Sequence, residues 1–346
     1  MKRVYMGEGN TPLVPSIRIA AALNCDHLFF KLENLNPSGS YKDRFAAAEV
    51  SRMLASGTKG CLATSSGNTG AALAAYCARH NLSCMIVVNS DTAHGKLAQM
   101  QAHGARVLSL QGFTASPRVL QSTIETLTEI AGECGLSFVV SAYRFCPIGM
   151  IGVEAIAREL LQQCETPIDH IFVPLGGGGL FAAICRGFEK EQEPRPRIHA
   201  VQPTGCPTVL GAFQRGDDNI RPVDSTTRIS GLSVPFDIDA GLALRRLRQS
   251  GGVAFGVSDE EVFEAQQMLF SHEGLYAEPA GAAALAGLCR ARREGIVSSA
   301  DTVVCLVTGH GFKDPESISL AASRHPVTSV EADALRDTIQ SLAKCG

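Results

Sequence analysis

Short apolar runs alternate with longer amphipathic segments along almost the whole chain. The short runs have the length of buried strands, and the longer segments repeat their apolar residues at helical spacing. Strands that alternate with helices form parallel sheets, because each crossover returns the chain to the same edge and places its helix against a face. We therefore predict an α/β protein in which helices cover both faces of parallel sheets.

The expected elements follow from this pattern. Strands are predicted over 27–32, 60–64, 84–88, 106–110, 137–140, 170–174, 198–201 and 302–307. Helices are predicted over 41–55, 69–80, 96–103, 116–133, 149–163, 180–189, 259–272 and 280–292. The last 25 or so residues are expected to form a peripheral helix.

Length and charge limit the function classes. The 346 residues suffice for two domains or one large α/β unit. A formal net charge of -3 argues against binding nucleic acid through its phosphates. No stretch of about 18 apolar residues is present, and the first residues lack the apolar segment of a signal peptide. We expect a cytoplasmic protein without a nucleic-acid or membrane partner.

The cysteines are numerous but not arranged as metal ligands. None of the twelve forms a C-x-x-C pair, and no Cys/His cluster has zinc spacing. Several lie in apolar runs, such as Cys305 within 303–307. We predict reduced, mostly buried thiols and no metal site.

The strongest motif is a run of four glycines, Gly176, Gly177, Gly178 and Gly179, between a predicted strand and a predicted helix. Such a turn presents backbone N–H groups and the positive end of a helix to a phosphate. It matches neither the Walker A motif nor the dinucleotide fingerprint. The alternative is a tight turn that lets helix and sheet pack closely, and the motif alone does not decide between them.

A second loop has the sequence Thr64-Ser65-Ser66-Gly67-Asn68-Thr69-Gly70. It follows a predicted strand and precedes an alanine-rich helix. Hydroxyl, amide and backbone N–H groups converge there, which suits a carboxylate ligand. The alternative is an ordinary Ser/Asn helix cap.

A third motif contains Lys42, in Asn36-Pro37-Ser38-Gly39-Ser40-Tyr41-Lys42-Asp43-Arg44. Lysine is scarce, with eight in the chain, and Lys42 lies just after a turn at the start of a helix. An amine held there is a candidate nucleophile that forms a Schiff base. A surface lysine on a first helical turn is the alternative. Taken together, an amine, a phosphate cup and a carboxylate cradle are what a pyridoxal phosphate (PLP) enzyme for amino acids needs.

These motifs resemble those of the fold-type II PLP family, the tryptophan synthase β-like enzymes. The stretch 39–44 resembles the family's PLP-lysine motif, 65–69 its substrate-carboxylate loop, and 176–179 its phosphate loop. The resemblance covers nearly the whole chain. It implies a two-domain, three-layer α/β fold with parallel sheets, a homodimer, and PLP in a cleft between the domains. The smaller domain is expected at 46–142, inserted between 1–45 and 143–346 of the larger one.

Within this family the chain resembles the threonine synthases in its opening segment, 7–13, and its closing segment, 308–314. The resemblance implies that Lys42 binds PLP covalently and later moves protons. It also implies that Asn68 bonds the PLP 3′-oxygen, that Thr308 faces the pyridine nitrogen, and that Gly176–Gly179 hold the phosphate. The implied substrate contacts are Ser65, Ser66, Gly67, Thr69, Ser141 and Arg144.

Two departures from the threonine synthase pattern bear on the substrate. Glycines replace the asparagines usual in the phosphate loop, as in dehydratases and serine racemase. Cys146 occupies the position of the arginine expected to bind a substrate phosphate. The remaining candidates for that phosphate are Arg144, Ser141, Thr69 and Lys96.

The sequence thus predicts a PLP-dependent carbon–oxygen lyase or synthase that acts on a small L-amino acid. Conversion of O-phosphohomoserine to threonine is the leading hypothesis. The alternatives are a serine/threonine dehydratase-type β-elimination and a β-replacing synthase of the cysteine or cysteate kind. Intact Lys42, Asn68 and Thr308 argue against a non-catalytic PLP-binding protein, and the missing fingerprint argues against an NAD enzyme.

Overall fold

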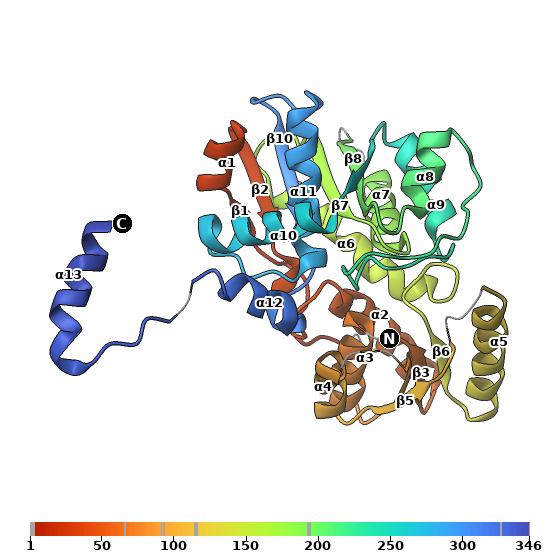
Figure 1. The fold of residues 1–346 in the computed structure, drawn as a ribbon. Helices are drawn as coiled ribbons and strands as arrows, with labels where there is room; N and C mark the ends of the chain where they lie inside the picture. Colours follow the sequence, from red (N-terminus) through yellow and green to blue (C-terminus); the bar gives the residue numbers. More distant parts are fainter. Residues whose placement is uncertain are drawn as a thin grey trace.

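The structure, a computed structural model, describes residues 4–65, 67–90, 92, 94–113, 117–191, 195–325 and 327–345. Its strands form two separate sheets (Figure 1). The six-stranded sheet has the order β1 (Leu13–Pro15), β2 (His27–Lys31), β10 (Thr302–Leu306), β7 (His170–Pro174), β8 (Arg197–Pro203) and β9 (Ala254–Val257). The four-stranded sheet has the order β5 (Arg106–Leu110), β4 (Ser83–Asn89), β3 (Gly60–Thr64) and β6 (Ser137–Val139).

All strand pairs are parallel except β1 with β2, as the alternation of strands and helices predicts. Strand β10, from the end of the chain, lies between β2 and β7. Its Cys305 pairs with Phe30 on one side and Phe172 on the other. This pairing brings residues near both ends of the chain to the middle of one sheet.

The helices occupy the segments between the strands. They are α1 (Arg18–Leu23), α2 (Lys42–Ser56), α3 (Asn68–Arg79), α4 (His94–Ala102), α5 (Pro117–Glu133), α6 (Pro147–Gln163), α7 (Gly179–Lys190), α8 (Thr208–Arg215), α9 (Ala240–Gln249), α10 (Asp259–Met268), α11 (Pro279–Arg293), α12 (Pro315–Ala322) and α13 (Leu335–Cys345). Helix α11 packs on β7, β8, β9 and β10, whereas α7 and α9 contact β7 and β8. Figure 1 shows α13 apart from the other elements.

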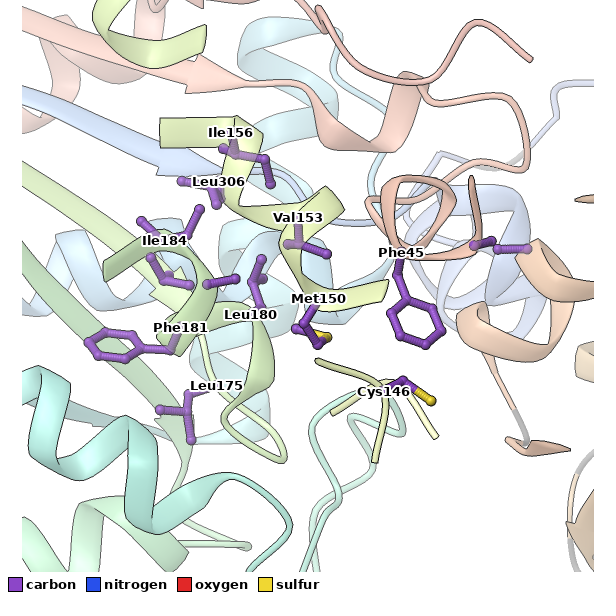
Figure 2. Packing of buried hydrophobic residues seen from close by; sticks show 14 of the residues in the cluster. Phe45, Cys146, Met150, Val153, Ile156, Leu175, Leu180, Phe181, Ile184 and Leu306 are labelled. Carbon is purple, nitrogen blue, oxygen red and sulfur yellow. The ribbon is translucent and has the colours of Figure 1, made fainter. Parts of the chain in front are cut away.

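Two apolar cores lie on the opposite faces of the larger sheet. Within β7, Ile171 and Val173 belong to one core and Phe172 to the other, because successive side chains of a strand point to opposite faces. The first core continues through α6, where Met150 and Val153 lie toward Phe45 of α2 and Ile156 lies toward Leu306 of β10 (Figure 2). Helix α2 therefore packs between α6 and α3, and it connects the two sheets.

The predicted α/β fold class is confirmed, and all eight predicted strands are present. Sequence analysis missed the short strands β1 and β9 and the helices α1, α8, α9 and α12. The predicted helix over 259–272 ends as an α-helix at Met268 and continues as a π-helical turn, Leu269–Glu273. Of the eleven cysteines whose side chains the structure describes, eight are buried, as predicted. None of the described helices combines the length and apolar character needed to cross a membrane.

Candidate active site

A cavity of about 330 Å³ lies at the carboxyl ends of β3, β7 and β10. In parallel sheets, the loops that follow the strands gather at this edge and form the usual binding site. Residues from all three motifs line the cavity, although they are far apart in the sequence. Among the predicted residues, the lining includes Lys42, Ser65, Gly67, Asn68, Thr69, Ser141, Gly176, Gly177, Gly178, Gly179 and Thr308.

Lys42 is the first residue of α2, and its amine reaches into the cavity. The amine Nζ donates a hydrogen bond to Oγ of Ser141 over 2.9 Å. It also lies 4.7 Å from the centre of the Tyr41 ring, within the range of a cation–π contact. Ser141 lies just after β6, a strand of the four-stranded sheet. A hydroxyl at the end of the smaller sheet therefore orients the Lys42 amine.

Backbone contacts tie the Lys42 loop to the closing motif of the chain. Ser40 forms a β-bridge with Gly309, and the N–H of Tyr41 donates to the carbonyl of Thr308 over 3.1 Å. A second bridge, between Ala277 and His310, brings Glu278 to the same wall. These contacts explain how Lys42 and Thr308 come to line one cavity.

The four-glycine turn has the geometry of an anion cup. Within the described part of the chain, none of the backbone N–H groups of Gly176–Gly179 donates a hydrogen bond to the protein. Buried N–H groups are rarely left without an acceptor, so a ligand is expected to supply one. The glycine turn leads into α7, which begins at Gly179 and whose positive end adds to the attraction for an anion. The cup therefore fits the phosphate of PLP.

Gly178 satisfies a separate backbone requirement. Its φ of +96° is disfavoured for other residues, and a Cβ there would lie 2.6 Å from the carbonyl oxygen of Asp239. At Gly177 the nearest atom to an added Cβ is a Val234 methyl carbon at 3.4 Å. Within the glycine run, Gly178 is therefore required by its backbone conformation, and all four glycines line the cavity.

The second loop caps α3 and presents Asn68 to the cavity. Ser65 Oγ accepts hydrogen bonds from the N–H groups of Gly67, at 3.3 Å, and Gly70, at 3.0 Å. Asn68 Nδ2 donates to Oε1 of Glu278 over 2.6 Å. Ser66, another predicted contact, lies outside the described residues. The helix start and the Ser65 and Thr69 hydroxyls suit a substrate carboxylate.

Arg144 lies outside this cavity. It is exposed, it stacks over Phe145 at 5.6 Å, and it lines an adjoining pocket of about 780 Å³. The two spaces share walls at Thr64, Ser65 and Val140. The side chain of Lys96, the other cation considered for a substrate phosphate, lies outside the described part of the chain.

Cys146 and His310 have structural surroundings. Burial raises the pKa of the Cys146 thiol to about 12, and this residue precedes α6 in the apolar core (Figure 2). His310 Nδ1 accepts the N–H of Phe312, and its ring contacts those of Tyr276 and Phe312. Burial and the nearby Lys313 lower the pKa of His310. Neither side chain lines the cavity.

Sequence reasoning gave no role to three residues that shape the site. Buried Asp239 accepts the N–H groups of Tyr143, at 2.7 Å, and Arg144, at 3.2 Å, and it packs beside Gly179. Burial raises the pKa of Asp239. Gln99 and Lys313 line the cavity and hydrogen-bond to each other over 2.8 Å. Asp239 and Gln99 carry no motif, whereas Lys313 lies in the closing segment 308–314.

Three thiols away from the cavity lie close together in space although their spacing in the sequence does not indicate a cluster. The sulfur atoms of Cys61, Cys77 and Cys84 lie within 4.8 Å of one another. Strands β3 and β4 bring Cys61 opposite Cys84, and α3 supplies Cys77. All three are buried in the apolar core, and we interpret them as small packing residues.

Comparison with known proteins identifies relatives over most of the chain. The sequence pattern of the family described as "Pyridoxal-phosphate dependent enzyme" matches residues 4–309. Threonine synthase of Methanocaldococcus jannaschii is 32% identical over 96% of this chain and 81% of its own length. Threonine synthase of Bacillus sp. (strain ULM1) is 33% identical over 95% and 90%, respectively. The solved structure of processed threonine deaminase isoform 2 from Solanum lycopersicum superposes with a TM-score of 0.75 at 20% identity, over 92% of this chain and 88% of that one.

Proposed function

The chain belongs to the pyridoxal-phosphate dependent enzyme family and is threonine synthase-like, and from this premise we propose that it converts O-phosphohomoserine and water into threonine and phosphate. Enzymes of this kind use PLP for elimination or replacement on an amino acid. The observation that carries the proposal is the placement of the Lys42 amine, 2.9 Å from Ser141, in a cavity that also contains the glycine cup.

The cavity residues divide between cofactor and substrate. We assign Lys42 to the covalent link with PLP and the N–H groups of Gly176–Gly179 to its phosphate. Asn68 is assigned to the 3′-oxygen and Thr308 to the ring nitrogen, because both line the same cavity. A hydroxyl partner leaves a pyridine nitrogen largely unprotonated, which is compatible with elimination and replacement.

The chain's own groups supply binding and proton transfer. When bound, PLP supplies an electron sink for the α-carbon of the substrate. The start of α3, with Ser65 and Thr69, holds the substrate carboxylate. The Lys42 amine, once free, removes the α-proton, and Ser141 orients that amine through their hydrogen bond. Departure of phosphate and addition of water complete the reaction.

A dehydratase-type elimination is the second candidate function, and the glycines of the phosphate loop, which resemble those of dehydratases, favour it. The segment 229–234 resembles a dehydratase segment as much as a synthase one, and its residues 230–234 line the cavity beside Gly176 and Gly177. The third candidate is β-replacement of the cysteine or cysteate synthase kind, which the same cofactor and lysine support. The three candidates differ in substrate and in whether a nucleophile adds.

Three assays on the PLP-loaded protein test the proposal. O-phosphohomoserine is expected to release phosphate and form threonine in equal amounts, and Lys42→Ala should abolish both. Formation of 2-oxo acid from L-serine or L-threonine, without phosphate release from O-phosphohomoserine, would replace the proposal with the dehydratase function. Addition of a thiol or sulfite to an activated serine as the sole activity would indicate the β-replacing synthase.

We also propose how the chain is organised in the cell. Residues 46–142, which include the whole four-stranded sheet, are assigned to the smaller domain, and 1–45 with 143–346 to the larger one. Exposed isoleucines on α6, Ile148 and Ile151, support a homodimer. A cysteine-rich sequence without a disulfide or zinc spacing pattern supports a cytoplasmic location.

A further inference from the structure

We propose that the Lys313 ammonium binds a second anionic group of the substrate, which makes this a site for an amino acid with a phosphorylated side chain. This inference rests on the proposed function and deepens it. It assigns recognition of the leaving group to Lys313, a cavity-lining residue of the closing segment, and not to the position where the threonine synthase pattern expects an arginine.

Lys313 is one of two cations on the cavity wall. Among the described side chains that line the cavity, only Lys42 and Lys313 are cationic. Lys42 is engaged with Ser141 and is required for covalent chemistry. Arg144 lines the adjoining pocket, and buried Cys146 offers no charge at the arginine position. Lys313 is therefore the described cation that is left to recognise an anionic group.

The backbone directs Lys313 toward the cavity. It ends the short 3₁₀ turn Gly311–Lys313, and its Cε would lie 3.0 Å from a Cβ built at Gly39. Gly39 has a φ of +90°, so the turn before Lys42 lets the lysine side chain pass closely over it. The Nζ then donates to Oε1 of Gln99 on α4 over 2.8 Å.

The Lys313 ammonium has an uncharged hydrogen-bond partner. The hydrogen bond that Lys313 Nζ donates goes to a neutral amide oxygen, Oε1 of Gln99. Glu278 and Asp43 attract the ammonium electrostatically and so act to raise the pKa of Lys313. Asp43 accepts both the N–H and the hydroxyl of Ser38, and Glu278 accepts Asn68. Burial lowers the pKa of Lys313, because a buried charge is costly unless an opposite charge compensates it.

An anionic substrate group can supply an opposite charge. An ammonium has three N–H donors, and Gln99 occupies one, which leaves two for a ligand. A lysine binds phosphate as a compact charge, with short charge-assisted hydrogen bonds. Neutral L-serine and L-threonine offer no such partner. The position of Lys313 therefore favours a phosphorylated amino acid over a neutral one.

The test measures phosphate binding as well as turnover, on full-length PLP-loaded protein. Inorganic phosphate is titrated calorimetrically and tested as a competitive inhibitor. Lys313→Met is expected to weaken phosphate binding and to raise KM for O-phosphohomoserine, each at least 10-fold, with a smaller effect on kcat. Lys313→Arg should recover most of the affinity. The matched control is Lys59→Met, an exposed lysine far from the cavity lining, which should leave both values unchanged.

A second variant covers the case in which Lys313→Met fails to fold. Gln99→Glu places a carboxylate within hydrogen-bond distance of the Lys313 ammonium. Because this carboxylate would neutralise the ammonium, the variant should also bind phosphate at least 10-fold more weakly. Unchanged phosphate affinity in either folded variant overturns the inference, while turnover of O-phosphohomoserine still supports the proposed function. Conversely, Lys313-dependent phosphate binding without turnover of O-phosphohomoserine supports the inference and refutes the proposed substrate.

Discussion

At the scale of single residues, the hydrogen bond from Lys42 to Ser141 orients the amine on which the chemistry depends. We predict that Ser141→Ala lowers kcat for O-phosphohomoserine about 2- to 10-fold, because an ordinary hydrogen bond contributes about 0.5–1.5 kcal/mol. The visible absorbance of bound PLP should persist. The control is Ser319→Ala on α12, whose hydroxyl bonds only within its helix. A kcat equal to that of wild type would show that Ser141 does not orient the amine.

Single residues also show which parts of the site the sequence could predict. Lys42, Asn68, Thr308 and the glycine run carry motifs, and all of them line the cavity. The sequence suggests Arg144 only through its nearness along the chain to the expected arginine position, but the turn after β6, held by Asp239, keeps Arg144 in the adjoining pocket. Asp239 itself lacks a motif, because its role arises only from the packing of the segment before α9 against the glycine turn.

At the scale of elements, substitutions in the glycine turn that leads into α7 should distinguish loss of cofactor binding from loss of stability. Gly177→Val should weaken PLP binding at least 10-fold with little change in thermal stability, because its Cβ meets only an ordinary contact inside the protein. Gly178→Val should lower thermal stability as well, because it combines a positive φ with a backbone clash. Absorbance titration with PLP and thermal unfolding measure the two effects. Normal PLP affinity in Gly177→Val would show that the cup has been assigned to the wrong loop.

Strands β7 and β8 contain a buried histidine pair that couples the fold to pH. His170 Nδ1 and His199 Nε2 lie 2.9 Å apart, and His170 Nε2 lies 3.2 Å from Asp301. Burial lowers the pKa of His199 to about 3 and also lowers that of His170. Below about pH 6.5 the unfolded chain therefore binds more protons than the folded one.

The free energy of unfolding should accordingly fall as the pH drops from about 6.5 toward 3, by up to about 1.4 kcal/mol per pH unit for a single histidine. His199→Gln should be less stable at pH 7 but should lose less stability on acidification. His27→Gln, at an exposed position of β2, is the matched control and should keep the wild-type slope. Denaturant unfolding at several pH values measures this, and equal slopes for wild type and His199→Gln would contradict it.

Five of the six elements missed by sequence analysis have eight residues or fewer, and the exception is the ten-residue α9. Strands β1 and β9 have three and four residues, which is too few to display a period. Helices α1 and α8 have six and eight residues, and their formation depends on packing against the rest of the protein. The long buried strands and helices carry enough apolar residues to be read directly, so the fold class could be predicted while its short edges could not.

At the scale of the whole molecule, the exposed isoleucines of α6 argue for a second copy of the chain. Ile148 and Ile151 are 45% and 51% exposed and lie three positions apart on one side of the helix. We predict a solution mass twice the 36.6 kDa of the chain, measured by light scattering. Ile151→Lys should shift the protein toward the single-chain mass, and Ile130→Lys on α5 should not. A wild-type mass of one chain would contradict the homodimer.

The central claim is that Lys42 holds the cofactor, and borohydride reduction followed by peptide mass spectrometry tests it most directly. The purified protein should be yellow, reduction should remove the visible band, and the pyridoxyl group should be found on Lys42. Lys42→Ala should carry no such group on any of the remaining seven lysines. A protein that stays colourless with added PLP, or a label on another lysine such as Lys313, would contradict the account.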